Sequence, residues 1–354
     1  MTTYIIRRLL LIPLLLFGVS VMIFGMLQFL QPIERAALYT RDVPKNDNMI
    51  PGIIKRYCLD CPMYVQYWNW LVGTKDPITA ERRGGILFGD FGWSKTTSQP
   101  VIQLIERRFP NTLDLTLWAV LPVILPGIWL GVQAAVHHNG FIDQAARVFS
   151  IVGTSVPIFV FGLMALMFFY ANLQWFPPGR LSDAYSQVVL SSQFHHYTSL
   201  LTIDALLNAR FDVFLDALRH MLLPILTLSY ISWATFVRVT RGSMLETLRQ
   251  EYVVTARAKG LPESDVVYKH ARPNAMLPIV TLAGFQVVGL LAGVIITETV
   301  FDYPGIGSAA AEASAQLDVI TVLGFAMFNG FILIVANLVV DVLYAVVDPR
   351  VRLS

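Results

Sequence analysis

The chain has 354 residues, of which 55% are hydrophobic and 14% are charged, and its mean hydropathy is +0.58. This composition is far more apolar than that of an average soluble domain, and it indicates an integral membrane protein. The net charge is only +2 and no basic run is interleaved with aromatic residues, which argues against a nucleic-acid-binding protein.

The first 30 residues predict a membrane span. Arg7 and Arg8 precede an apolar run from Leu9 to Leu30, an order that secretory signals also have. The apolar region of a secretory signal is about 7 to 15 residues long and is followed by a small-residue cleavage site. This run is longer and no such site follows, so we expect it to stay attached as the first span.

Residues 31–100 predict a small, irregular elaboration outside the cytosol. Charge in so long a loop does not set its side of the membrane, so its side follows from the alternation of the spans. Its two cysteines, Cys58 and Cys61, favour a disulfide in an oxidising compartment, with unpaired thiols and half of a metal site as the other interpretations. No second Cys or His cluster completes a zinc site.

Five further apolar stretches are long enough to cross a bilayer, which takes about 20 residues. They are Leu113 to Val136, Val148 to Leu173, Met221 to Val239, Ala275 to Thr297 and Val319 to Val346. Apolar residues recur at helical spacing from Val101 to Phe109, which predicts an interfacial helix leading into the second span. The predicted fold class is therefore all-α and polytopic, with six transmembrane helices.

The distribution of charge predicts that both termini are cytoplasmic. An even number of spans places both ends on one side, and the positive residues Arg7, Arg8, Arg350 and Arg352 make that side the cytosol. The loop after the fifth span contains four acidic residues and no Lys or Arg, which places it outside.

Residues 241–274, between the fourth and fifth spans, are the most informative polar stretch. An excess of Lys and Arg predicts a cytosolic loop. These basic residues are Arg249, Arg257, Lys259, Lys269 and Arg272. The first predicted helix starts at Glu251 and is stopped by Gly260 and Pro262. The second runs from Glu263 to Ala271, until Pro273 breaks it.

The side chains on the faces of the two predicted helices suggest different kinds of contact. Small side chains at Ala256 and Ala258 would allow a partner to pack tightly on the first helix. The second helix is expected to place Val266, Val267 and His270 on one side. Periodicity alone does not distinguish this arrangement from an amphipathic connector that lies on lipid headgroups.

The residue pattern of the loop resembles one known family. YVVTARAKGL followed by HARPNAMLP is similar to the cytoplasmic loop of bacterial ABC importer permeases, in the peptide, dipeptide and nickel branch. Further similar patches follow the family order: GDFGWS with PVIQLIERRFPNTL, WFPPGR, TETVFDYPGIG and LYAVVDPRVR. Val254 and Pro273 depart from the loop pattern, and the stretch from Ile33 to Leu87 departs from the family.

The resemblance implies a type I ABC importer permease that works by alternating access. It implies a first span over 1–30, an outer elaboration over 31–100, a permease core over 101–346 and a cytoplasmic tail over 347–354, in a prokaryotic inner membrane. In this family the first loop helix docks on an ATPase subunit. The coupling residues carried over are Glu251, Tyr252, Ala256, Arg257, Gly260 and Leu261.

The same resemblance implies the partners and the solute. A second permease subunit, two ATPase subunits and an extracytoplasmic binding protein are expected, with di- or oligopeptides as solute and nickel chelates, glutathione or oligosaccharides as alternatives. The chain has no GxxxxGK(S/T) phosphate loop, so ATP and Mg²⁺ are expected on the ATPase subunits, with no cofactor or metal here.

Few polar residues fall inside the spans. Gln286 and Asn329 are candidates for lining a pathway, although hydrogen bonding between helices is the commoner role. A transporter that works alone, the alternative from a different class, predicts repeated halves and charged mid-membrane sites. Neither is evident in this sequence, and no catalytic motif is found.

Overall fold

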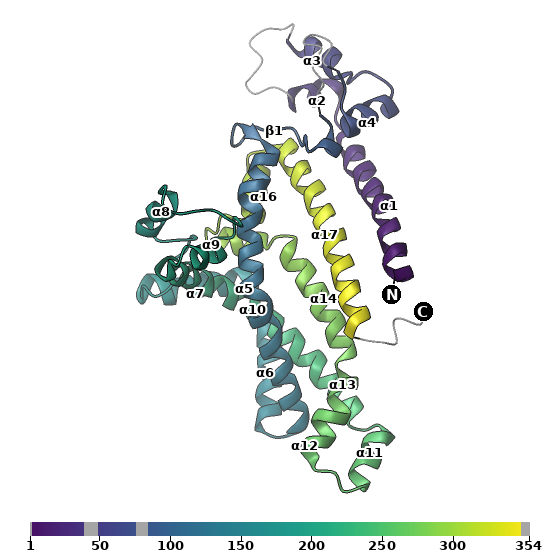
Figure 1. Ribbon diagram of the computed structural model, residues 1–354, viewed down its shortest axis with the longest axis vertical. Helices are drawn as coiled ribbons and strands as arrows, with labels where there is room; N and C mark the ends of the chain where they lie inside the picture. The colour runs from purple at the N-terminus through teal and green to yellow at the C-terminus, as the bar shows by residue number, and fades with distance from the viewer. Residues whose placement is uncertain (1, 39–48, 76–83, 348–354) are drawn as a thin grey trace. The chain divides into compact units, whose positions relative to one another are not determined.

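The computed structural model describes residues 2–38, 49–75 and 84–347, and this part of the chain is almost entirely helical (Figure 1). It divides into two compact units, one formed by residues 1–109 and 309–354 and the other by residues 110–308. Residues 348–354, which make up nearly all of the predicted cytoplasmic tail, lie outside the described residues.

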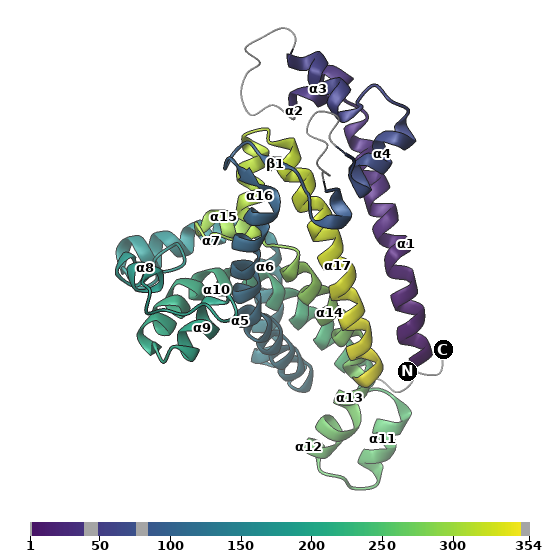
Figure 2. The same ribbon diagram turned by 45° about the horizontal axis from the view of Figure 1, so that its top comes forward.

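The first unit is organised on two long apolar helices. α1 (Thr2–Leu27) and α17 (Val319–Val347) lie side by side (Figures 1 and 2). A Cβ added at Gly330 of α17 would lie 3.0 Å from the side chain of Val19, so the glycine lets the two helices approach closely. The pair therefore forms the apolar frame of this unit.

Short elements follow the C-terminal end of α1. They are α2 (Pro32–Leu38), α3 (Met49–Tyr57), α4 (Met63–Val72), the 3₁₀ turn η1 (Ile86–Phe88) and a small hairpin of β1 (Trp93–Ser94) with β2 (Gln99–Pro100). Tyr67 holds α4 to α1, because its hydroxyl lies 2.7 Å from Ser20 Oγ and its ring packs edge-on against Phe24. Such tertiary contacts explain why helices form where the sequence shows little periodicity.

The second unit has its core between three long helices, α5 (Val101–Val136), α10 (Phe211–Thr247) and α14 (Leu277–Leu291). The buried side chains at their centre include Leu115, Val123, Met221, Phe236, Ile279 and Leu290. Gly127 and Gly131, one turn apart on α5, face α10 so closely that an added Cβ would lie 2.7 Å from Phe236 and 2.6 Å from Thr240. Small residues at this spacing allow close helix contact inside a membrane.

The remaining helices of the chain are shorter. They are α6 (Phe141–Ser155), α7 (Ile158–Ala165), the π-helical η2 (Leu166–Asn172), α8 (Asp183–Leu190), α9 (Leu201–Leu207), α15 (Ile295–Val300) and α16 (Ile306–Ala315), apart from four that form the predicted cytosolic loop. Among the described residues, four helices are long and apolar enough to cross a membrane, or six if each of two bent pairs counts as one span.

The third predicted span is not one straight helix. α6 and the stretch formed by α7 and η2 meet at 100°. Val156 at the junction is extended, with φ −93° and ψ 122°, which is the conformation that a residue before a proline prefers. The apolar run from Val148 to Leu173 conceals this break, because hydropathy does not register the steric effect of Pro157.

The interfacial helix predicted from Val101 to Phe109 leads into the second span, and the two form one helix of 36 residues, α5, that continues through Pro110. One other predicted helix end is wrong. The fifth predicted span ends at Leu291, before Thr297, because Gly293 adopts φ +95°, in the left-handed region that favours glycine.

Candidate functional site

The first helix of the predicted loop is α11 (Glu251–Ala258). Glu251 lies in its first turn and Arg257 in its last, so both charges complement the helix dipole. Gly260 follows with φ +76° and ends the helix. The start and stop predicted from the sequence are both confirmed.

The second helix runs farther than predicted. α12 (Glu263–Asp265), the π-helical η3 (Val266–Ala271) and α13 (Arg272–Ala275) follow one another without a gap. Pro273 does not break this run, since it lies in the first turn of α13, where a proline is tolerated because its missing N–H has no intrahelical partner to lose. The π-turn adds a residue, so Ala271 is buried and His270 is exposed, contrary to the predicted face.

The loop packs on the ends of two long helices of its own unit. Val253 and Ala256 of α11 and Val266 and Val267 of η3 are buried with side chains from α5 and α10. These are Val132 and Ala135 of α5 and Met244 of α10. Ser243 of α10 donates a hydrogen bond of 2.8 Å to the carbonyl of Ala275. Residues of α11, α5 and α10 therefore belong to one buried core.

The buried side of α11 defines its outward face. Because Val253 and Ala256 point inward, helical spacing places Glu251, Val254, Thr255 and Ala258 on the opposite face. Ala256 is only 6% exposed, so it cannot contact a partner in this conformation, contrary to its predicted role. Ala258 supplies the small exposed side chain instead.

The turn between the helices is braced by charge. Arg257 donates to both carboxylate oxygens of Glu263, with its Nη2 2.6 Å and its Nε 3.0 Å away. Tyr252 and Leu261 are 44% and 38% exposed and lie beside the outward face of α11. Gly260 has no heavy atom within 4 Å of an added Cβ, so its backbone conformation, rather than lack of space, selects glycine. We name these exposed residues together the α11 surface: Glu251, Tyr252, Val254, Thr255, Ala258, Gly260 and Leu261.

Two family models match the chain. Residues 127–353 match the family described as "Binding-protein-dependent transport system inner membrane component", and residues 1–116 match the N-terminal part of such membrane components. The chain belongs to this permease family. The second model also covers the stretch from Ile33 to Leu87, which the sequence motifs alone left outside the resemblance.

Curated relatives extend over nearly the whole permease. It is 37% identical to the di/tripeptide transport system permease protein of Pseudomonas aeruginosa (strain UCBPP-PA14), over 99% of both chains. It is 37% identical to a probable D,D-dipeptide transport system permease protein of Escherichia coli (strain K12), over 94% of this chain and 93% of that one. It is 32% identical to the oligopeptide transport system permease protein of Bacillus subtilis (strain 168), over 99% and 100%.

Gln286 and Asn329 remain predictions as pathway residues of this permease. Gln286 is half-buried on α14 and forms no hydrogen bond with the described residues. Asn329 lies on α17, and its Oδ1 is buried without a partner among the described residues. The described part of the chain thus gives neither side chain an interhelical hydrogen bond. Cys58 and Cys61 are joined by a disulfide.

Glu298 has a structural role that sequence analysis missed. The sequence analysis treated this residue only as one of the negative charges of a predicted outer loop. Its carboxylate accepts hydrogen bonds of 2.8 Å from Thr112 Oγ1 and 2.9 Å from the Ser308 N–H. A Cβ at Gly305 would lie 2.3 Å from this carboxylate, so the TETVFDYPGIG motif encloses it. Burial raises the pKa of Glu298, and the hydrogen bonds from Thr112 and Ser308 offset this only in part.

Asp318 plays a similar part in the first unit. It is buried and caps α17, since its Oδ1 accepts from the N–H of Thr321 at 3.2 Å. Its Oδ2 accepts from Ser94 Oγ and from the N–H groups of Lys95 and Thr96 in the β1–β2 hairpin. Burial alone would raise the pKa of Asp318, but the hydrogen bonds outweigh it and hold that pKa below its usual value.

Asp114 is also more buried than its place near a span end suggests. It is 0% exposed on α5, and it accepts hydrogen bonds from the hydroxyl and the N–H of Thr202 in α9. The partner lies 88 positions later in the chain. Spacing along the sequence therefore gives no indication of it.

Proposed function

We propose that this permease is the membrane subunit of an ATP-driven importer for di- and oligopeptides. The three relatives above are named for dipeptide, di/tripeptide or oligopeptide transport, and they align over more than nine-tenths of the chain. The observation that carries the coupling role is the α11 surface. It joins an exposed helical face to a buried core that continues into α5 and α10.

In the proposed topology six spans cross the inner membrane and both termini lie in the cytosol. The basic loop then faces the cytosol, and the segment with the disulfide faces outward, where disulfides persist. Each of the bent pairs counts as one span in this arrangement.

The proposed mechanism is alternating access. Two ATPase subunits bind ATP and Mg²⁺, close on each other and move α11. Since Val253 and Ala256 share one buried cluster with residues of η3, α5 and α10, the movement passes to the long helices that enclose the core of the unit. A second, related permease completes the pathway, and an extracytoplasmic binding protein delivers the peptide.

Cysteine crosslinking tests the α11 surface. Ala258→Cys, placed on the outward face, is expected to form a crosslink to an ATPase subunit in native membranes. Ala256→Cys is the matched control, because its side chain lies inside the loop and should not react. A crosslink from position 256 alone, or none from position 258 in an assembled complex, would contradict the proposal.

A further inference from the structure

The first unit contains a cavity of about 460 Å³ at the end where α1 stops and α17 begins. We call it the α1–α17 pocket. Its apolar lining includes Phe24, Leu27, Trp70, Trp93 and Leu323, and its polar lining includes Gln28, Arg35 and Gln66. A volume of this size matches pockets that hold small organic groups.

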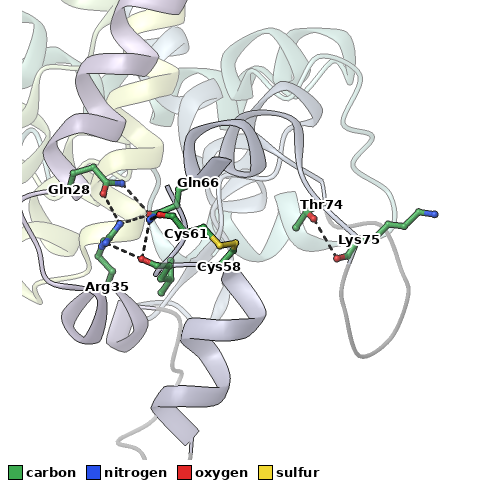
Figure 3. Close-up of a disulfide and its surroundings, with 8 residues drawn as sticks. Gln28, Arg35, Cys58, Cys61, Gln66, Thr74 and Lys75 are labelled. Carbon is green, nitrogen blue, oxygen red and sulfur yellow. Dashed lines mark hydrogen bonds between the residues drawn. A yellow bond between two sulfur atoms is a disulfide. The ribbon is translucent and has the colours of Figure 1, made fainter. Parts of the chain in front are cut away.

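Arg35 is the most informative residue of the pocket lining, because it is 8% exposed. Its Nη1 donates hydrogen bonds to the side-chain oxygens of Gln28 and Gln66, and its Nη2 donates one of 3.2 Å to the carbonyl of Leu59 (Figure 3). All three acceptors are neutral. No carboxylate among the described residues pairs with this guanidinium.

The hydrogen-bond capacity of Arg35 is not exhausted. A guanidinium has five N–H donors, and three are used by the contacts above. The Nε–H is buried without a partner in the described chain, and Nη2 has one donor left. The Nε and Nη2 donors form a fork that matches two oxygens of a phosphate or carboxylate. The pocket lining thus contains a guanidinium that forms no ion pair with the described residues and keeps unused N–H donors, together with one carboxylate, that of Asp90.

The surroundings of the pocket indicate a membrane boundary. Two candidate spans, in α1 and α17, end at the pocket. Large side chains on the neighbouring α4 and η1 are exposed to solvent: Met63, Tyr64 and Trp68 of α4, and Leu87 and Phe88 of η1. Exposed aromatic residues at this level of a span are typical of the headgroup layer.

We propose that the α1–α17 pocket binds the anionic headgroup of a phospholipid, with Arg35 as the residue that holds the phosphate. In the topology proposed above, the lipid belongs to the outer leaflet. The apolar lining from α1 and α17 accommodates the first part of the acyl chains. Basic pockets beside membrane spans recognise lipid headgroups by the same physical principle. This role is separate from solute transport and from ATPase coupling.

The Cys58–Cys61 disulfide flanks Leu59, which lines this site. Leu59 lies inside the ring that the disulfide closes, and its carbonyl accepts hydrogen bonds from Arg35 Nη2 and from Gln66 Nε2. Gln66 also donates to the carbonyl of Cys61 (Figure 3). The disulfide therefore fixes the carbonyls that orient both side chains.

Lipid photolabelling tests the proposal on the assembled transporter. The complex is reconstituted in phosphatidylcholine nanodiscs doped with photoactivatable phosphatidylglycerol, and the label is mapped by mass spectrometry. We expect labelled peptides from α2 and α4, and about tenfold less label in Arg35→Gln, the loss expected for a charge-assisted hydrogen bond. Lys55→Gln removes an exposed charge of α3 outside the pocket and should leave the labelling unchanged.

A second pocket variant, a competition measurement and a comparison of lipid probes distinguish the proposal from its alternatives. Asn69→Trp fills the pocket without removing any hydrogen bond of Arg35, and it should lower the labelling even if Arg35→Gln fails to assemble. Excess inorganic phosphate should not displace the label, and displacement would identify a small-anion site instead. Equal labelling of the wild type and both pocket variants, or equal labelling by photoactivatable phosphatidylcholine, would overturn the proposal.

Discussion

The loop at residues 251–275, proposed to be cytosolic, and the described part of residues 31–100, proposed to be the outer segment, are both built from short helices, but different forces hold them. Val253, Ala256 and Val267 of the loop are buried among apolar side chains of adjacent helices. The outer segment depends on a buried guanidinium, a disulfide and the carboxylate of Asp318. Apolar packing transmits movement, whereas directional polar contacts fix one geometry. The difference agrees with the coupling role proposed for the loop and with the binding role proposed for the α1–α17 pocket.

Removal of the Asp318 carboxylate should cause the largest loss in this comparison. Asp318→Ala deletes the cap of α17 and three acceptor contacts to the β1–β2 hairpin. We expect a cost of about 2 kcal/mol, because buried N–H groups lose a charged acceptor. Hydrogen exchange of residues 93–100 should accelerate roughly thirtyfold, while Glu312→Ala, an exposed acid nearby, should change nothing.

The same carboxylate predicts a pH dependence. Because the pKa of Asp318 is lowered in the folded chain, its stabilisation is complete above the unfolded pKa of about 4 and is lost as pH falls through the folded value. Protection of the hairpin amides, corrected for the intrinsic pH dependence of amide exchange, should therefore be lost only in acid. A loss of protection between pH 5 and 8 would require a different titrating group.

Overpacking of the loop core should have the next largest effect. Ala256→Leu inserts three carbon atoms where the alanine is 6% exposed, and it should cost about 1 to 3 kcal/mol. Limited proteolysis in native membranes should then cut the loop faster. Ala258→Leu is the control, since its exposed side chain should leave the proteolysis rate at the wild-type value. Equal protection of both variants would show that α11 does not pack as described.

Loss of the brace at the turn should have the smallest effect. Arg257 and Glu263 are both largely exposed, at 41% and 58%, so Arg257→Gln should cost under about 1 kcal/mol, and less at high salt. Hydrogen exchange of α11 at low and high salt measures this cost. Lys269→Gln breaks the comparable pair with Asp265 and serves as the control. A large loss of uptake with a small change in exchange would assign Arg257 to the ATPase contact.

Local signals made the loop predictable from the sequence. The charges of Glu251 and Arg257 and the glycine at 260 act within one turn, and they gave both ends of α11. The burial of Ala256 depends on a cluster that also includes residues of η3, α5 and α10, so the sequence of α11 alone did not predict it. Helical periodicity assumes a constant number of residues per turn, and the π-turn at Val266–Ala271 departs from it. Ala271 is therefore buried and His270 is exposed, whereas the periodicity placed His270 on the side of Val266 and Val267.

Long-range pairings could not be predicted from the sequence in either unit. Asp318 and Ser94 are 224 positions apart, and Glu298 and Thr112 are 186 apart, so spacing along the chain carries no trace of either contact. The cysteines could be paired because they are close in sequence. The reason for the pair appears only when Leu59 is seen to accept from Arg35 and Gln66.

The Cys58–Cys61 bond implies an order of events in biogenesis. Thiols synthesised in the cytosol stay reduced, so in the proposed topology this ring closes only after the segment has been translocated and has met an oxidant. Insertion of the helices and completion of the outer segment are then separate steps, carried out by different machinery. A cell deficient in thiol oxidation would accumulate inserted subunits in which Arg35 is poorly held, and their defect would be one of maturation rather than of synthesis.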